Sequence, residues 1–212
     1  MKNSDSTLNL TLRLLIITVC AGLILGLVYA ITLEPIEYQT ELKATQARTQ
    51  VLAQAQDFEE IDMDTLSYDP EEYSIVQKIF KGTDASGTAG YTFEIVTKGY
   101  SAGLTLTVGI NSEGSITGVA IGSHEETPGL GANATKPEFL GQYTGPGPFT
   151  VVKGGSASAE SEADDVAGAS TQAEAGAKDV QALTGATITS NAVTDAVNKV
   201  LAFYDAYLKE GV

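Results

Sequence analysis

The sequence predicts an α+β fold, with an N-terminal transmembrane helix followed by a domain that has an antiparallel sheet and flanking helices. Three observations predict it. A run of about twenty uncharged residues lies near the N-terminus, four strand-like segments follow at short intervals, and apolar residues recur at helical spacing near the C-terminus. At 212 residues the chain has room for one domain of ordinary size with appendages.

The composition excludes several classes of function. With 27 acidic against 12 basic residues, the formal net charge is −15. Such a surface repels nucleic-acid phosphates and anionic lipid headgroups, so we expect neither as a broad partner. Cys20 is the single cysteine and His124 the single histidine, which excludes an internal disulfide, a Cys-based iron–sulfur or zinc site and a His-rich metal site within this chain. Any redox cofactor held by this chain must therefore be organic.

Residues 14–33 contain no charged side chain and are mostly Leu, Ile, Val, Ala and Gly. A helix of about twenty such residues crosses the hydrocarbon core of a bilayer. Lys2 and Arg13 precede the run and Glu34 follows it. The positive-inside rule therefore predicts a cytoplasmic N-terminus, with the rest of the chain on the outer side of the cell (inner) membrane. A cleaved signal peptide is the alternative, because residues 28–30 resemble a cleavage site. The length of the apolar run favours a retained anchor.

The chain then divides into four expected parts: a cytoplasmic N-terminus (1–13), the transmembrane helix (14–33), a helical spacer and connection (34–72) and an extracytoplasmic domain (73–212). Apolar residues at helical intervals predict that the helix continues from 34 to about 60. Residues 57–73 hold eight acidic residues and Pro70, which predicts a surface connection.

Four segments rich in β-branched and aromatic residues predict strands: 73–80, 91–97, 104–110 and 115–121. Turn-forming clusters at 82–87 and 111–114 separate them. Strands joined by short connections favour antiparallel pairing. We expect residues 139–149 to form a loop with a short helical start, and 151–153 to form a last strand.

Residues 183–190 place four hydroxyls within eight positions, and Gly185 and Ala186 allow a tight turn. The loop opens a helix, since apolar residues recur after it at three- and four-residue spacing: Val193, Val197, Val200, Leu201, Tyr204 and Leu208. Free N–H groups and the positive dipole end of a helix start favour an anion, and a Thr or Ser there can serve as N-cap. The loop therefore predicts a phosphate site, and the alternative is a hydroxyl-rich helix cap without a ligand.

Residues 124–131, with the sequence His-Glu-Glu-Thr-Pro-Gly-Leu-Gly, form the second informative stretch. Pro128 and Gly129 predict a tight turn, in which Thr127 can hydrogen-bond locally or to a ligand. Acid–base catalysis is the alternative, but nothing here supplies a nucleophile to pair with the acidic side chains, so we expect no catalytic residue. By contrast, residues 154–178 are almost all Gly, Ala, Ser, Glu, Asp and Thr, a composition that predicts a flexible acidic loop.

Residues 184–189, Thr-Gly-Ala-Thr-Ile-Thr, resemble the Ser/Thr-Gly-Ala-Thr-x-Thr signature of a family of FMN-binding domains. The family includes the G subunit of the Rnf electron-transport complex and the C subunit of the sodium-pumping NADH:quinone oxidoreductase. The resemblance implies that Thr189 carries FMN through a phosphoester bond made by a separate flavin transferase. It also implies that the rest of the motif, Thr184, Gly185, Ala186 and Thr187, binds the cofactor. Where the family often has an Asp, three residues before the motif, this chain has Gln181.

Two further stretches are similar to the same family. Residues 124–131 match its His-x-Glu-Thr-Pro-Gly-Leu-Gly motif beside the flavin ring, which implies that Thr127 and Leu130 contact the ring while Glu126 and Gly129 shape the loop. Residues 99–103 are similar to its Gly-Tyr-x-Gly segment, which adds Tyr100, and a family lysine near the flavin corresponds to Lys153. A cation there stabilises an anionic reduced ring.

The N-terminal anchor and the overall length look more like the Rnf G subunit than the longer C subunit. The resemblance implies a membrane-anchored extracytoplasmic flavoprotein that passes electrons through covalent FMN, with other membrane subunits as partners and no substrate site of its own. For that complex it implies electron transfer between ferredoxin and NAD, coupled to sodium or proton movement. The alternatives are a flavinylated domain of a quinone oxidoreductase or extracellular electron-transfer system, and an anchored binding module without redox activity.

Overall fold

The computed structural model describes residues 4–85, 87–152 and 176–209. The chain forms two compact units, Met1–Lys43 and Ala44–Val212. The helices are α1 (Ser4–Val51), α2 (Pro137–Leu140) and α3 (Thr187–Phe203), with short 3₁₀ turns at Met63–Thr65, Gly131–Thr135 and Gly141–Tyr143 and a π-helical turn at Tyr204–Leu208. The strands are β1 (Asp57–Ile61), β2 (Val76–Asp84), β3 (Gly87–Thr97), β4 (Leu104–Asn111), β5 (Ile116–Ile121), β6 (Phe149–Val152) and β7 (Lys178–Gln181).

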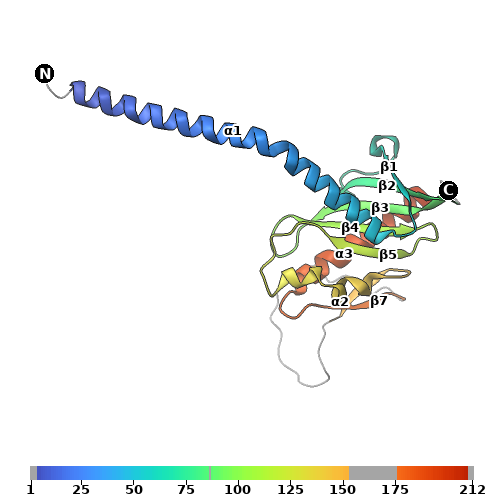
Figure 1. Cartoon of the computed structure of the whole chain (residues 1–212). Coiled ribbons are helices and arrows are strands. Elements are labelled where there is room, and N and C mark those ends of the chain that lie inside the picture. Colours follow the sequence, from blue (N-terminus) through green and yellow to red (C-terminus); the bar gives the residue numbers. More distant parts are fainter. Residues whose placement is uncertain (1–3, 86, 153–175, 210–212) are drawn as a thin grey trace, which may run out of the picture. The chain divides into compact units, whose positions relative to one another are not determined.

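The first unit consists of helix α1 up to Lys43 (Figure 1). It includes the predicted span 14–33, and by length and composition the described helix could cross a membrane. Its apolar side chains are exposed, and the hydroxyls of Thr18 and Thr32 donate to backbone carbonyls within the helix. A bilayer interior suits such a surface, because its polar side-chain groups are satisfied internally.

The second unit is built on a five-stranded antiparallel sheet with the order β1-β2-β3-β4-β5. The predicted α+β class and antiparallel sheet are confirmed. A separate pair, β6 and β7, is parallel and was not predicted as such, although a last strand near 151–153 was expected. Lys153 and the predicted acidic loop, up to residue 175, lie outside the described residues.

Two sequence predictions about this sheet are wrong. Residues 57–61 form strand β1 rather than part of a helix or a surface connection, and α1 ends at Val51. Phe58 and Ile61 are three positions apart, so their side chains lie on opposite faces of the sheet and pack in different apolar clusters. The segment therefore lacks the two-residue apolar period that predicts a strand. Residues 82–84, predicted as a turn, extend β2, because Gly82 pairs with Gly90 across the ladder.

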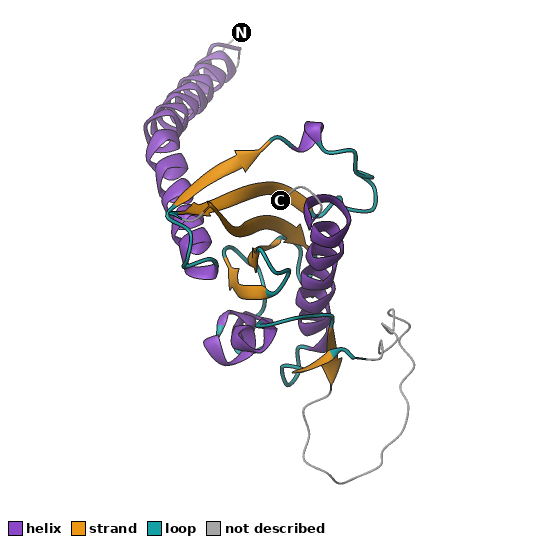
Figure 2. Ribbon diagram, turned by 90° about the vertical axis from the view of Figure 1, so that its right-hand side faces the viewer, coloured by secondary structure: helices purple, strands orange, loops and turns teal. Residues whose placement is uncertain are grey.

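Helix α3 covers one face of the sheet (Figure 2). Its predicted apolar face is confirmed, since Val193, Val197 and Val200 are all fully buried. At its C-terminal end Phe203 packs edge-on against Phe93 of β3, with ring centroids 5.9 Å apart. Aromatic and aliphatic burial of this kind supplies most of the stabilisation of a domain of this size. The packing fixes the start of α3 beside the loops that leave β3 and β5.

Residues 48–55 pack against the opposite face of the sheet. A Cβ at Gly109 or Gly118 would lie against the backbone of Val51, and one at Gly82 would meet the side chain of Leu52. Glycine at these positions of β4, β5 and β2 therefore allows the chain to approach the sheet closely.

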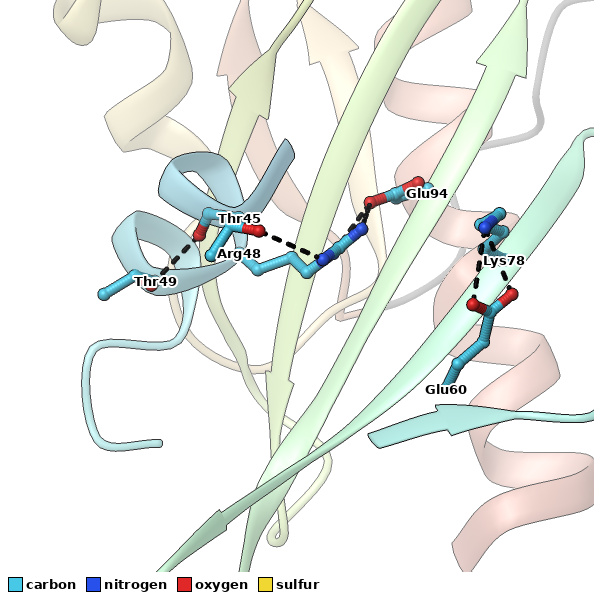
Figure 3. Close-up of polar contacts among 6 residues, drawn as sticks. All are labelled: Thr45, Arg48, Thr49, Glu60, Lys78 and Glu94. Carbon is cyan, nitrogen blue, oxygen red and sulfur yellow. Dashed lines mark hydrogen bonds and ion pairs between the residues drawn. The ribbon is translucent and has the colours of Figure 1, made fainter. Parts of the chain in front are cut away.

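Arg48 anchors this contact (Figure 3). Its guanidinium lies 2.8 Å from Glu94 Oε1 of β3 and 3.7 Å from the centre of the Phe80 ring. Arg48 is 5% exposed, so this charge is compensated by a carboxylate and an aromatic face rather than by water. The Lys78–Glu60 pair in the same figure is about half exposed, and such pairs contribute little to stability.

Candidate functional site

A pocket of about 520 Å³ lies at the N-terminal end of α3. Three segments that are far apart in the sequence form it: residue 100, residues 126–131 and residues 185–189. Its lining residues are Tyr100, Glu126, Thr127, Leu130, Gly131, Gly185, Ala186, Thr187, Ile188 and Thr189. The volume falls within the usual range for a small-molecule or cofactor site.

The loop before α3 is closed by its own hydrogen bonds. Gly185 has a φ of +74°, a conformation that glycine adopts readily. The Ser190 hydroxyl accepts from the Leu183 N–H at 3.0 Å and donates to the Ala186 carbonyl at 3.0 Å. The expectation that a Thr or Ser side chain caps the helix is wrong, because Ala186 is the N-cap and makes no side-chain cap bond.

The first turn of α3 leaves backbone donors available. Residues 187–189 are its first three positions, whose N–H groups have no acceptor within a helix. Together with the positive end of the helix dipole, these donors favour an anion at the pocket.

The floor of the pocket holds a buried carboxylate and a buried hydroxyl in contact. Thr189 Oγ1 donates to Glu126 Oε2 at 2.8 Å, and the Ser101 N–H donates to Glu126 Oε1 at 3.0 Å. Glu126 is 6% exposed and Thr189 0%. Within the described part of the chain Glu126 takes part in no ion pair. Its charge is therefore stabilised by two neutral donors.

Glycines leave room for this carboxylate. A Cβ at Gly99 would clash with Glu126 Oε1. A Cβ at Gly131 would clash with Glu126 Oε2 and would lie 2.8 Å from Thr189 Oγ1. Both carboxylate oxygens are thus flanked by positions where any larger residue would push the side chain away from Thr189.

The mouth of the pocket is apolar and exposed. Among the described residues beyond α1, the large hydrophobic side chains that are exposed are Val96, Tyr100, Leu130 and Ile188. The last three line the pocket, with exposed fractions of 70%, 44% and 57%. Such a rim suits a flat apolar ring or a contacting protein surface.

The chain is similar to several known proteins. The family model for the FMN-binding domain matches residues 99–202, a range that includes every lining residue of the pocket. The chain is 31% identical to the G subunit of the ion-translocating oxidoreductase complex of Methanosarcina acetivorans over 97% of this chain and 98% of that protein. The chain belongs to this family of G subunits.

Two further relatives carry names that include the electron carriers. The G subunit of the Na⁺-translocating ferredoxin:NAD⁺ oxidoreductase complex of Acetobacterium woodii is 34% identical, over 89% of this chain and 85% of that protein. The G subunit of the proton-translocating ferredoxin:NAD⁺ oxidoreductase complex of Clostridium ljungdahlii is 30% identical, over 94% and 92%. A solved structure, the C subunit of the Na⁺-translocating NADH-quinone reductase of Parabacteroides distasonis, shares the fold, with a TM-score of 0.56 over 82% of this chain and 95% of that one at 18% identity.

Most of the site residues predicted from the sequence of this chain line the pocket. Thr184 is exposed just before it, and Gly129 forms the turn beside it with a φ of +82°, so neither lines the pocket. Lys153 lies outside the described residues. The structure adds Gly131 and Ile188 to the lining, and Ser101 as a partner of Glu126. Across the described ranges, no three His, Cys, Asp or Glu side chains gather into a group that could hold a metal ion.

Proposed function

We propose that this chain is the membrane-anchored flavin subunit of an ion-translocating ferredoxin:NAD oxidoreductase complex, and that it carries FMN covalently at Thr189. The observation that carries the proposal is the convergence of three separate motifs on one pocket at the start of α3. The names of the related G subunits supply the reaction of the complex.

The pocket fits FMN in both of its chemical parts. The phosphate requires donors and a positive potential, which the first turn of α3 offers beside Thr189. The isoalloxazine ring requires flat apolar contacts, which Tyr100 and Leu130 offer at the rim together with Thr127 as a polar neighbour. When bound, the flavin supplies the electron-transfer chemistry, while the protein sets its position and electrostatic surroundings.

The remaining site residues have supporting roles in this proposal. Thr184 and Gly129 set the course of the two loops that frame the pocket, and Gly185, Ala186 and Thr187 bring the backbone close to the phosphate. To Lys153, which lies outside the described residues, we assign by resemblance the role of a cation that would favour an anionic reduced ring.

A covalent bond suits the location that we propose. By the positive-inside rule, Lys2 and Arg13 favour an N-terminus in the cytoplasm and an FMN domain outside, where a dissociated flavin would be diluted and lost. A phosphoester bond removes that equilibrium. A flavin transferase is then required as a maturation partner.

The chain acts as an electron carrier between other membrane subunits and has no substrate site of its own. The complex couples electron transfer between ferredoxin and NAD to sodium or proton movement, and related G subunits occur in complexes named for either ion.

Intact mass spectrometry of the full chain purified from its native membrane tests the proposal. We expect a mass increment of one FMN less water, which disappears in Thr189→Ala. Thr135→Ala is the matched control, because Thr135 is an exposed threonine that does not line the pocket, and it is expected to keep the increment. A native chain with the bare polypeptide mass would contradict the proposal.

A further inference from the structure

The four hydroxyls of residues 183–190 differ in their partners. The Thr189 hydroxyl donates to the carboxylate of Glu126, whereas the Ser190 hydroxyl donates to a backbone carbonyl. Thr184 and Thr187 are exposed, and the structure describes no side-chain hydrogen bond for either of them. Within this described loop, therefore, one hydroxyl is in contact with a group that can take its proton.

That contact has the geometry of general base catalysis. A threonine hydroxyl is a weak nucleophile until an adjacent base removes its proton. A competent base lies within about 2.6–3.2 Å of the group it deprotonates, and Glu126 Oε2 lies 2.8 Å from Thr189 Oγ1. The Ser101 N–H holds the other carboxylate oxygen, which fixes the orientation of the side chain.

The surroundings of Glu126 hold its carboxylate in contact with the Thr189 hydroxyl. Among the described residues no cation is paired with it, and its two oxygens accept from Thr189 Oγ1 and the Ser101 N–H. Gly99 and Gly131 give it the space to lie against Thr189. Since Thr189 is 0% exposed and Glu126 6%, bulk solvent has little access to the pair.

We propose that Glu126 is the general base that selects Thr189 as the flavin acceptor during maturation. The inference rests on the proposed function. Thr189 Oγ attacks the phosphorus of the flavin phosphate in a phosphoanhydride donor held by the transferase. The new Oγ–P bond forms, the anhydride P–O bond breaks, and the leaving phosphate takes that electron pair. The hydroxyl proton passes to Glu126 Oε2, and no atom is oxidised or reduced.

The donor must be an anhydride because a phosphate monoester such as FMN would have to expel hydroxide. Its flavin phosphate reaches Thr189 through the pocket mouth, which the exposed side chains of Leu130 and Ile188 line. Glu126 is thus a catalytic residue of the modification, supplied by the acceptor protein itself.

The test follows the rate at which the unmodified full chain, in detergent, gains mass in the presence of a flavin transferase and flavin adenine dinucleotide. Glu126→Gln keeps an oxygen that can accept from Thr189 but cannot hold its proton. We expect the initial rate to fall by at least about 100-fold, a typical contribution of a general base. Glu125→Gln is the matched control: Glu125 is the neighbouring, exposed carboxylate, and its loss is expected to leave the rate within about twofold of wild type.

Thermal unfolding of each variant separates a chemical effect from a folding defect. If Glu126→Gln retains the wild-type melting temperature and is modified at a rate within about threefold of wild type, the inference is overturned while the proposed function stands. If Glu126→Gln does not fold, Glu126→Asp decides, because it retracts the carboxylate by one methylene. A loss of about tenfold or more supports the inference, and an unchanged rate overturns it. If the wild-type chain itself gains no mass, the proposed function fails.

Discussion

Two carboxylates on opposite faces of the domain have different partners. Glu94, 19% exposed, faces the guanidinium of Arg48 at 2.8 Å, and the pair holds residues 48–55 against the sheet. Glu126, 6% exposed, faces the Thr189 hydroxyl and a backbone N–H. The first carboxylate is compensated by a full positive charge. Among the described residues, the partners of the second are neutral donors.

The difference separates a structural role from a chemical one. The carboxylate of Glu94 compensates a buried guanidinium, so its loss would remove a charged partner of Arg48. A carboxylate that is hydrogen-bonded to a hydroxyl can accept that hydroxyl's proton without leaving another buried charge unpaired. We therefore expect substitutions around Glu94 to change stability and those around Glu126 to change FMN incorporation.

Glu94→Ala should have the largest effect on stability. It removes the carboxylate that faces the buried guanidinium of Arg48, which costs about 3 kcal/mol in unfolding free energy, at the lower end of the range because Glu94 is partly exposed. Chemical denaturation measures this. Glu60→Ala, in the exposed Lys78–Glu60 pair, is the control and should cost less than about 1 kcal/mol. FMN incorporation per folded molecule should be unchanged in both variants. A loss of incorporation in Glu94→Ala would contradict the assignment of a purely structural role to Glu94.

Gly131→Ala should have an intermediate effect on stability and should also slow FMN incorporation. The added Cβ would clash with Glu126 Oε2 and crowd Thr189 Oγ1, at a cost of about 1–3 kcal/mol. Because it displaces the base from the nucleophile, the rate of mass gain should fall by at least about tenfold. Gly141→Ala serves as control, since a Cβ there has no atom within 4 Å and the φ of −65° suits alanine. Normal incorporation in Gly131→Ala would show that the carboxylate position is not critical.

Tyr143→Phe should have the smallest effect. It removes a buried hydrogen bond of 2.7 Å between the Tyr143 hydroxyl and Thr194, worth about 1 kcal/mol. No charge is involved, so FMN incorporation should not change. A fall in incorporation would indicate that neutral polar contacts behind Thr189 also control the site.

The same variant has a signature in alkaline solution. Burial raises the pKa of Tyr143 above its ordinary value, against a smaller lowering by the Thr194 hydrogen bond. Above about pH 10 the unfolded chain loses a phenolic proton that the folded chain keeps, so stability falls as pH rises, with a slope of up to about 1.4 kcal/mol per pH unit. Denaturant titrations between neutral pH and about pH 11 should show a shallower fall for Tyr143→Phe than for wild type. An equal fall would contradict this assignment.

Local sequence signals explain which elements were predicted. Helix α3 carries buried apolar residues at helical spacing. Strands β2 to β5 were found from their β-branched and aromatic residues and the turns between them, although register shifts interrupt the two-residue period in β2 and β5. Strand β1 was not predicted, because its two apolar residues pack on opposite faces of the sheet. The parallel pairing of β6 with β7 is a contact between distant segments, which local pattern does not encode.

The candidate site also combines features that the local sequence predicts with a contact that it does not predict. Local turn chemistry and motif resemblance selected most of the pocket lining, and Gly131 was available as the last residue of the 124–131 motif. The hydrogen bond between Glu126 and Thr189 joins residues 63 positions apart. Its existence depends on how the start of α3 lies against the loop that follows β5, so only the folded chain reveals it.

Peptide mapping of the mature protein tests the central claim most directly. Trypsin cleavage after Lys178 and Lys199 releases a single peptide, 179–199, that contains all four hydroxyls of the loop. Fragmentation of that peptide by electron transfer identifies which residue carries the added mass. We predict one FMN on Thr189 and none on Thr184, Thr187 or Ser190. FMN on another of these hydroxyls, or an unmodified peptide from the native membrane, would contradict the account.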